Sequence, residues 1–274
     1  MERKNPSFEE LIRMRVVYTV PGMEAVSVRR DLPYKTGDGT DGPPLCMDVY
    51  SPPGAPRARP AVILVHGGPI PMIGARRMGV FVSYGELLAA SGFVGVAFDH
   101  RFLAPDRLPD AAGDVADLVA HVCANAAALG VDPGRVALWA FSGGGPFLAA
   151  ALRERPAYVR AVVSYYAVLD LAEPAPGAES GLGPDVRLAF SPVHALGEDA
   201  RSAPPVLVAR AGLDNPWLNG GADRFVQAAM ARGATLDLLN HPEGRHGFDI
   251  LDDDARSKQI IRRTLEFLRD HLAP

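Results

Sequence analysis

The stretch from Val136 to Phe147, VALWAFSGGGPF, constrains the fold of this 274-residue chain more than any other. Its apolar run ends abruptly on Ser142, and three glycines follow. This pattern is typical of a buried strand that turns sharply into a helix and leaves the serine exposed at the bend. Such a turn needs small residues two positions before and after the serine, and these are Ala140 and Gly144. The segment therefore predicts a strand, a sharp elbow and a helix.

The exposed serine has two interpretations. A serine hydroxyl becomes a nucleophile when a base removes its proton, and a sharp turn makes Ser142 accessible to both a base and a substrate. The other interpretation is a glycine-rich turn that packs closely or cradles a phosphate. A phosphate-binding loop would carry Lys-Ser or Lys-Thr after its glycines, whereas this chain has Pro146 and Phe147. We therefore favour Ser142 as a candidate nucleophile.

A second apolar run, Pro60 to Gly68 (PAVILVHGG), has the β-branched composition of a strand buried on both faces of a parallel sheet. Glycines at the end of such a strand let backbone N–H groups point into a cleft, where they stabilise the negative oxygen of a tetrahedral intermediate. We predict this oxyanion-binding role for Gly67, Gly68 and Gly143. His66 could also serve as a base, but its place beside the glycines favours a structural role in holding the loop.

The acid and the base that would activate the serine are expected later in the chain, with the acid first. Asp214 directly follows the buried-strand pattern of residues 205–213, and two histidines follow the short strand expected over residues 234–239. His246 stands in a loop beyond that strand, whereas His241 adjoins a proline at the strand edge, so His246 is the predicted base. A metal site made of these histidines and the glutamate between them matches no strong zinc spacing.

Together these segments resemble the α/β-hydrolase fold, from about Val26 to Leu272. The sequence DHRFLAPD, residues 99–106, is similar to the Asp-Tyr-Arg-Leu-Ala-Pro-Glu segment of hormone-sensitive-lipase-type esterases, with a histidine for the tyrosine and an added phenylalanine. Pro69 stands where that family has a third glycine. Compact carboxylesterases and dienelactone-hydrolase-like proteins are closer in size, although dienelactone hydrolases use a cysteine where this chain has Ser142. The resemblance implies serine-ester chemistry.

Composition favours one domain with a large core, since 48% of the residues are hydrophobic and 22% are charged. The formal charge of −4 gives no support for nucleic-acid binding. Cys46 and Cys123 lie in apolar patterns, which indicates buried thiols rather than a disulfide framework. The first residues, MERKNPSFEE, lack the apolar core of a signal peptide, and no apolar run is long enough for a membrane span. We therefore expect a cytoplasmic protein with neither a nucleic-acid nor a membrane partner.

Strand-like and helical runs alternate along the chain, which predicts an α/β fold with a mostly parallel central sheet covered by helices on both faces. The expected strands are Val26–Asp31 and Leu45–Ser51, which open the sheet as an antiparallel pair, then Pro60–Gly68, Val94–Asp99, the run that ends at Phe141, Arg160–Tyr166, Pro205–Leu213 and Ala234–Leu239. The expected helices are Val80–Ser91, Ala111–Leu129, Gly143–Arg153, Asp223–Arg232 and Asp253–His271.

Two segments lie outside this scheme. Residues 167–203 are rich in Pro, Gly and Ala, and they predict either a small cap inserted over the pocket or a plain surface excursion. Residues 1–20 carry Phe8, Leu11 and Ile12 at helical spacing, which predicts an N-terminal helical segment. That segment could cross the mouth of the active site, contact a second subunit in a homodimer, or lie on the surface. Residues 21–274 form the expected single α/β-hydrolase domain.

The apolar residues beside the predicted site are candidates for substrate binding, with ordinary packing as the alternative. They are Pro69, Ile70, Met72, Phe141 and Trp217. If several of them line the cleft, they favour a small apolar acyl or alcohol group.

The sequence as a whole predicts a serine hydrolase that cleaves carboxylic esters through an acyl-enzyme on Ser142. His246 would act as general base and then acid, and Asp214 would fix its tautomer. The expected partner is a small-molecule ester with a short acyl chain or a small aromatic group, and no metal or organic cofactor is required. Because one fold hosts many functions, peptidase, lactonase or acyltransferase activity and a non-catalytic small-molecule binder are the alternatives.

Overall fold

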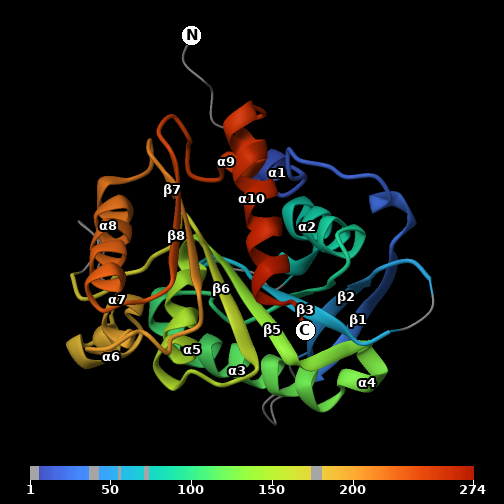
Figure 1. Ribbon diagram of the computed structural model, residues 1–274, viewed down its shortest axis with the longest axis horizontal. Coiled ribbons are helices and arrows are strands. Elements are labelled where there is room, and N and C mark those ends of the chain that lie inside the picture. Colours follow the sequence, from blue (N-terminus) through green and yellow to red (C-terminus); the bar gives the residue numbers. More distant parts are fainter. Residues whose placement is uncertain (1–5, 37–42, 55–56, 71–73, 174–180) are drawn as a thin grey trace.

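The apolar runs of the sequence form one eight-stranded sheet in the order β1-β2-β4-β3-β5-β6-β7-β8 (Figure 1). The computed structural model describes residues 6–36, 43–54, 57–70, 74–173 and 181–274. The strands are β1 (Ser27–Lys35), β2 (Leu45–Ser51), β3 (Arg59–Val65), β4 (Val94–Phe98), β5 (Val131–Phe141), β6 (Val159–Tyr165), β7 (Val206–Ala211) and β8 (Leu236–His241). β2 runs antiparallel to its neighbours β1 and β4, and all other neighbouring strands are parallel. The predicted fold class is confirmed.

Alternate residues of the central strands supply two separate cores. In β3, Ile63 and Val65 belong to one core, whereas Val62 and Leu64 belong to the other. All four side chains are at most 1% exposed. Side chains point to opposite faces of a strand in turn, so burial of both sets means that both faces of the sheet are covered.

Helices cover the two faces of the sheet (Figure 1). The first core takes side chains from α3 (Leu108–Ala124), α4 (Ala126–Leu129), α5 (Ala149–Glu154), α7 (Pro192–Ala195) and α8 (Pro216–Ala231). The second core takes side chains from α2 (Gly79–Ala90), α9 (Phe248–Leu251) and α10 (Ala255–His271). Short helices α1 (Phe8–Leu11) and α6 (Pro184–Ala189) complete the set of α-helices in the described part of the chain.

Three helices differ from the sequence prediction. The single helix predicted over Ala111–Leu129 is divided at Asn125 into α3 and α4. The segment after β5 begins as a 3-10 helix, Ser142–Leu148, and becomes α-helical only at Ala149. Pro146 lies inside that first stretch and has no N–H group for an α-helical hydrogen bond. Helix α8 begins at Pro216 rather than at the predicted Asp223. The side chain of Asn215 caps it by accepting a hydrogen bond from the N–H of Trp217 at 2.8 Å.

Most of the N-terminal segment from residue 6 to residue 20 is not helical. Among its described residues, only Phe8–Leu11 form an α-helix, which Ser7 caps. Beyond it the chain crosses the second face of the sheet, where the carbonyl of Ile12 accepts a hydrogen bond from the N–H of Gly79 at 2.7 Å. The N–H of Val17 then donates to the carbonyl of Asp249 at 2.8 Å. The segment therefore ties α2 to α9.

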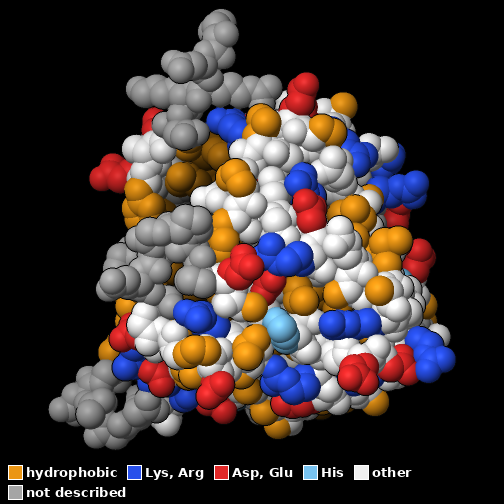
Figure 2. Space-filling model, turned by 90° about the vertical axis from the view of Figure 1, so that its left-hand side faces the viewer, with side chains coloured by type: hydrophobic (Ala, Val, Ile, Leu, Met, Phe, Trp, Pro, Cys, Tyr) orange, Lys and Arg blue, Asp and Glu red, His pale blue; other side chains and the backbone are white. Residues whose placement is uncertain are grey.

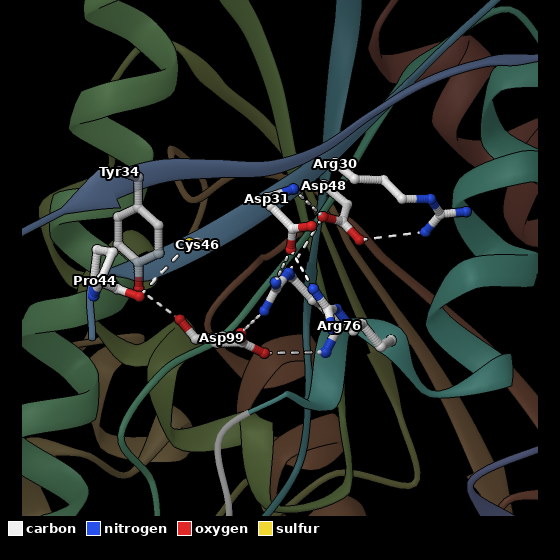
Figure 3. Close-up of polar contacts among 9 residues, drawn as sticks. Arg30, Asp31, Tyr34, Pro44, Cys46, Asp48, Arg76 and Asp99 are labelled. Carbon is white, nitrogen blue, oxygen red and sulfur yellow. Dashed lines mark hydrogen bonds and ion pairs between the residues drawn. The ribbon is translucent and has the colours of Figure 1, made fainter. Parts of the chain in front are cut away.

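Arg76 anchors the chain between β3 and α2 to the sheet (Figure 3). Its guanidinium pairs with Asp48 of β2 (Nε to Oδ1, 3.2 Å), with Asp31 of β1 and with Asp99 directly after β4. Asp48 is fully buried and Asp99 is 1% exposed. Buried carboxylates are costly unless a cation compensates them, and Arg76 supplies that charge. The loop that leaves β3 is thus fixed at its far end.

The predicted cap segment, residues 167–203, contains α6 and α7; its residues 174–180 lie outside the described ranges. Helix α7 packs on the first core through Ala195. The backbone carbonyl of Glu173 accepts a hydrogen bond from Trp217 Nε1 at 3.1 Å, which joins the segment to α8. That this segment covers the substrate pocket remains a prediction.

The surface over α6, α7 and α8 carries acidic, basic and apolar side chains interspersed (Figure 2). In the described part of that face no continuous basic patch is visible. Cys46 and Cys123 are free and half-buried. Within the described ranges, the helices are too short or too polar for any of them to span a lipid bilayer.

Candidate active site

The three predicted catalytic residues lie at one edge of the sheet. Ser142 directly follows β5, Asp214 follows β7, and His246 follows β8. These strands are parallel, so their carboxyl ends meet at the same edge, where open α/β sheets ordinarily hold their ligands. Residues separated by up to 104 positions in the sequence are therefore brought into contact.

Hydrogen bonds join the three side chains in a line. His246 Nε2 lies 2.8 Å from Ser142 Oγ, and His246 Nδ1 lies 2.7 Å from Asp214 Oδ2. The Asp214 side chain is 4% exposed and its other oxygen accepts the N–H of Asn215 at 2.7 Å. Because an ionised carboxylate can only accept, Nδ1 carries the imidazole proton and the free electron pair of Nε2 faces the serine. This arrangement can remove the hydroxyl proton.

The elbow places Ser142 in the left-handed region, with φ of 52°. This conformation is uncommon outside glycine and marks a constrained turn. The glycines after it are required by close packing: a Cβ on Gly144 would lie 2.7 Å from the carbonyl oxygen of Val65, and one on Gly145 would lie 2.1 Å from that of Val168. The Val168 N–H in turn donates to the carbonyl of Ser142 at 2.9 Å. The elbow is thus clamped between the chain after β3 and the chain after β6.

The predicted oxyanion glycines also meet at the elbow. A Cβ on Gly67 would lie 2.9 Å from Ser142 Cβ and 3.2 Å from the nitrogen of Gly143, and one on Gly143 would lie 2.0 Å from the carbonyl oxygen of Gly68. The N–H groups of Gly67 and Gly68 donate no hydrogen bond to another residue in the described part of the chain. Main-chain donors next to a candidate nucleophile are suited to stabilising an oxyanion.

His66 supports the loop that carries these glycines. Its side chain is 3% exposed, and its Nδ1 lies 2.7 Å from the carbonyl oxygen of Gly67. The ring of His100 stacks on it at 3.5 Å between centroids. Burial lowers the pKa of His66 to about 4, so the ring is neutral at pH 7. These contacts support the structural role predicted for His66.

The candidate substrate-binding residues have different surroundings. Pro69 is exposed, while Ile70 and Trp217 are half-buried. Ile70 borders a hollow of about 250 Å³ that also touches Phe8, Ile12 and Met78. Met72 lies outside the described residues.

Of the two interpretations of Phe141, substrate binding and ordinary packing, its burial favours packing. Phe141 is 3% exposed and stacks on Trp139 at 5.5 Å between ring centroids, with Phe81 edge-on at 5.6 Å. Because side chains alternate along a strand, Phe141 shares the second core with Trp139. It is a core residue beneath the elbow.

Two residues near His246, Tyr166 and Asp249, were not among the site residues predicted from the sequence. The ring of Tyr166 lies 4.7 Å from that of His246, and its hydroxyl donates to Asp249 Oδ1 at 2.7 Å. Asp249 is fully buried. Tyr166 directly follows β6, so its position at the carboxyl edge of the sheet was a usable signal, whereas nothing local marks Asp249.

The two histidines after β8 face different partners. His241 Nε2 lies 3.2 Å from Ser257 Oγ and 3.3 Å from Asp254 Oδ2, both on the α10 side, whereas His246 faces Ser142 and Asp214. Among the described residues, no group of three or more His, Cys, Asp or Glu side chains could hold a metal ion.

Comparison with solved structures identifies the fold. The chain matches a truncated form of a carbohydrate esterase from gut microbiota with a TM-score of 0.75 and 19% identity, over 99% of this chain and 100% of that one. This is the α/β-hydrolase fold. A bacterial heroin esterase shares it, with a TM-score of 0.73 and 21% identity over 92% of this chain and 86% of that one. Esterase 2 of Thermogutta terrifontis matches with a TM-score of 0.72 and 23% identity, over 97% and 99% of the two chains. The resemblance predicted from the sequence is confirmed.

Sequence comparisons match the first part of this α/β-hydrolase fold. The BD-FAE family model matches residues 47–180, which include the glycine loop and the serine elbow. A probable isoprenylcysteine alpha-carbonyl methylesterase of Arabidopsis thaliana is 31% identical over 109 residues, which are 40% of this chain and 25% of that protein. A second such methylesterase of the same plant is 30% identical over 128 residues, 47% of this chain and 28% of that protein. The match thus spans about a quarter of the length of these relatives.

Proposed function

We propose that this chain is a serine hydrolase that cleaves carboxylic esters. The observation that carries the proposal is the hydrogen-bonded line from Asp214 through His246 to Ser142, with the serine at a constrained elbow. A nucleophile, a base within hydrogen-bond reach and a group that orients the base are the three parts of covalent acyl transfer. The names of the matched structures and relatives, which are esterases and methylesterases, support the same reaction class.

In the proposed acylation, Ser142 Oγ attacks the ester carbonyl carbon while His246 Nε2 takes the hydroxyl proton. Asp214 stabilises the imidazolium through Nδ1, and main-chain N–H groups of Gly67, Gly68 and Gly143 stabilise the oxyanion. The tetrahedral intermediate then collapses, and its bond to the alcohol oxygen breaks. The alcohol leaves with the proton from His246, and the acyl group stays on Ser142.

Deacylation repeats these steps with water. His246 takes a proton from the water as its oxygen attacks the acyl carbon, and then returns that proton to Ser142 Oγ as the ester bond to the serine breaks. The carboxylic acid leaves and the free serine is restored. His246 carries every proton in this cycle, so the proposed chemistry calls for no metal or organic cofactor.

The proposed substrates are small esters with a short acyl chain or a small aromatic group. Ile70 and Trp217 are half-buried apolar residues that follow the glycine loop and the acid, and such residues favour compact apolar groups. The Thermogutta terrifontis esterase was solved with butyrate and with propionate bound, which are short acids. The proposed setting is cytoplasmic, with a small-molecule ester as the partner.

Labelling with a fluorophosphonate tests the nucleophile. Intact-mass analysis is expected to show one adduct per chain, located at Ser142, and the Ser142→Ala protein should take up none. Because the members of a catalytic triad act as a unit, Ser142→Ala should lower kcat by about 10⁴-fold or more on p-nitrophenyl acetate or butyrate. Ser202→Ala, at an exposed serine outside the site, is the matched control and should keep both properties.

Two outcomes would reject the proposal. Turnover by Ser142→Ala at the wild-type rate would exclude the acyl-enzyme. A folded wild-type chain that binds esters but shows neither labelling nor turnover would instead be a non-catalytic binder. A series of p-nitrophenyl esters of increasing acyl length, with an amide and a lactone beside it, then defines the substrate class.

A further inference from the structure

Asp249 is a buried carboxylate that the proposed reaction does not use. It lies in α9, three residues after His246, and is fully buried. Its Oδ1 accepts a hydrogen bond from the Tyr166 hydroxyl at 2.7 Å, and its Oδ2 accepts one from the Tyr84 hydroxyl at 2.8 Å. In the described part of the chain it has no Lys or Arg partner. Both carboxyl oxygens therefore have hydroxyl partners, and no cation among the described residues pairs with them.

Tyr166 connects this carboxylate to the imidazole of His246. The two rings lie 4.7 Å apart, tilted by 59°. The backbone of Tyr166 has φ of 38°, which is an outlier for a bulky residue, and its N–H donates to the carbonyl of Ala209 on β7 at 2.8 Å. A strained backbone persists where the surroundings hold it, and strain of this kind gathers at functional sites. The tyrosine ring is thus held against one side of the imidazole.

Asp249 is itself fixed from three directions. Tyr84 belongs to α2, Tyr166 follows β6, and the N–H of Val17 in the N-terminal segment donates to the Asp249 carbonyl. Burial raises the pKa of both tyrosine hydroxyls well above the ordinary value, so both remain hydrogen-bond donors over the pH range of an assay. The two tyrosine hydroxyls therefore keep their hydrogen bonds to Asp249 throughout that pH range.

A purely structural role explains this arrangement less well. Burial also raises the pKa of Asp249, which reflects the cost of keeping its charge away from water. Well-packed apolar residues would fill the same space without that cost. A negative charge close to His246 has a use only when the imidazole becomes positive, and in the proposed reaction this happens each time His246 takes a proton.

We propose that Asp249 is a positioning residue of the hydrolase: through Tyr166 it holds the His246 imidazole in line with Ser142, and its charge stabilises the imidazolium. This inference rests on the proposed function. The groups that face Asp249 are Tyr84 from α2, Tyr165 and Tyr166 from the end of β6, and His246. Those that face His246 are Ser142, Asp214 and Tyr166, while the neighbouring Arg245 is paired with Asp252.

The pH dependence of kcat/KM in Asp249→Asn tests the inference. The substitution keeps the shape of the side chain and removes its charge. Without that charge the imidazolium is less stable, so the acid limb should move to lower pH by roughly half a unit or more. Loss of alignment should lower kcat by up to about 100-fold with little change in KM. Thr264→Val is the matched control, because it removes a buried hydroxyl bonded to Tyr165 at 2.7 Å, lies outside the groups that face Asp249 and His246, and should leave the acid limb in place.

Tyr166→Phe provides a second variant if Asp249→Asn does not fold. It keeps the ring against His246 and removes only the bond to Asp249, so a smaller shift in the same direction is expected. If Asp249→Asn folds and keeps the wild-type acid limb and kcat, the inference is overturned. If Asp249→Asn does not fold, the same result in Tyr166→Phe overturns it. Fluorophosphonate labelling of wild-type Ser142 separates the two proposals: no labelling rejects the hydrolase, whereas labelling with an unmoved acid limb rejects only the role of Asp249.

Discussion

His66 and His246 occupy similar places in the chain and very different places in the molecule. Each follows a strand at the carboxyl edge of the same sheet, and each is followed by a glycine. His66 is 3% exposed, bonds its own loop through the Gly67 carbonyl and stacks on His100. The His246 side chain is 41% exposed and lies between a buried carboxylate and a hydroxyl.

The difference shows what a histidine needs in order to act as a base. A carboxylate at one nitrogen fixes the proton there and stabilises the cation that forms, and the other nitrogen must face the group that loses a proton. A position at the end of a strand does not by itself provide the carboxylate or the group that loses a proton. Burial without a carboxylate has the opposite effect, because it disfavours the charged imidazole and lowers the pKa of His66. We therefore propose proton transfer for His246 and loop support for His66.

Substituting each histidine by itself tests this comparison, and His246→Ala has the largest expected effect on kcat. His246→Ala should lower kcat on a p-nitrophenyl ester by about 10⁴-fold or more, since it removes the base from a group that acts as a unit. His66→Phe keeps a flat ring on His100 and should cost less than about 100-fold, because only the geometry of the glycine loop is disturbed. Equal losses in the two variants, measured on folded protein, would mean that His66 takes part in the chemistry.

The contact between the glycine loop and the elbow gives the next largest effect. Gly143→Ala places a Cβ 2.0 Å from the Gly68 carbonyl oxygen, so the loop must move away from Ser142. Loss of an oxyanion donor typically lowers kcat by about 10²- to 10³-fold, and KM should change less. Gly113→Ala in α3 is the matched control, because a Cβ there meets nothing within 4 Å. If Gly143→Ala keeps the wild-type kcat, the contact between Gly143 and Gly68 is not needed for catalysis.

The positions of most strands along the chain were predictable, because most strands are apolar runs bounded by turn residues. The same local reading located Ser142, Asp214 and His246, since each stands where such a run ends. Their catalytic roles remain predictions, although the structure brings the three side chains into hydrogen-bonding distance. Phe141 shows what the local pattern could not decide. Its place next to the serine allowed either pocket lining or packing, and the alternation of side chains along β5 places it in the core.

Contacts between distant strands were beyond the reach of the sequence. Arg76 meets Asp31, Asp48 and Asp99 only because β1, β2 and β4 are neighbours in the sheet. Tyr166 reaches His246 because β6 lies between β5 and β7, a strand order that no single segment encodes. The stacking of His66 on His100 likewise requires β3 and β4 to be paired.

The smallest expected effect concerns stability rather than catalysis. Burial holds the pKa of His66 at about 4, below its ordinary value of 6.5, and lowers that of His100 as well. Between pH 4 and pH 6.5, His66 is protonated in the unfolded chain and neutral in the folded chain. The free energy of unfolding should therefore decrease as the pH falls from 6.5 toward 4, by up to about 1.4 kcal/mol per pH unit for each such histidine.

Urea unfolding at a series of pH values in this window measures the effect. His66→Phe has no imidazole to protonate at that position, so its slope should be smaller than that of the wild type by about one proton. His194→Gln, at an exposed histidine of α7, is the matched control and should keep the wild-type slope. An identical slope in His66→Phe and the wild type would show that His66 takes up a proton in the folded state. His66 and His246 would then differ only in the groups that they contact, and not in whether the imidazole is kept neutral by burial.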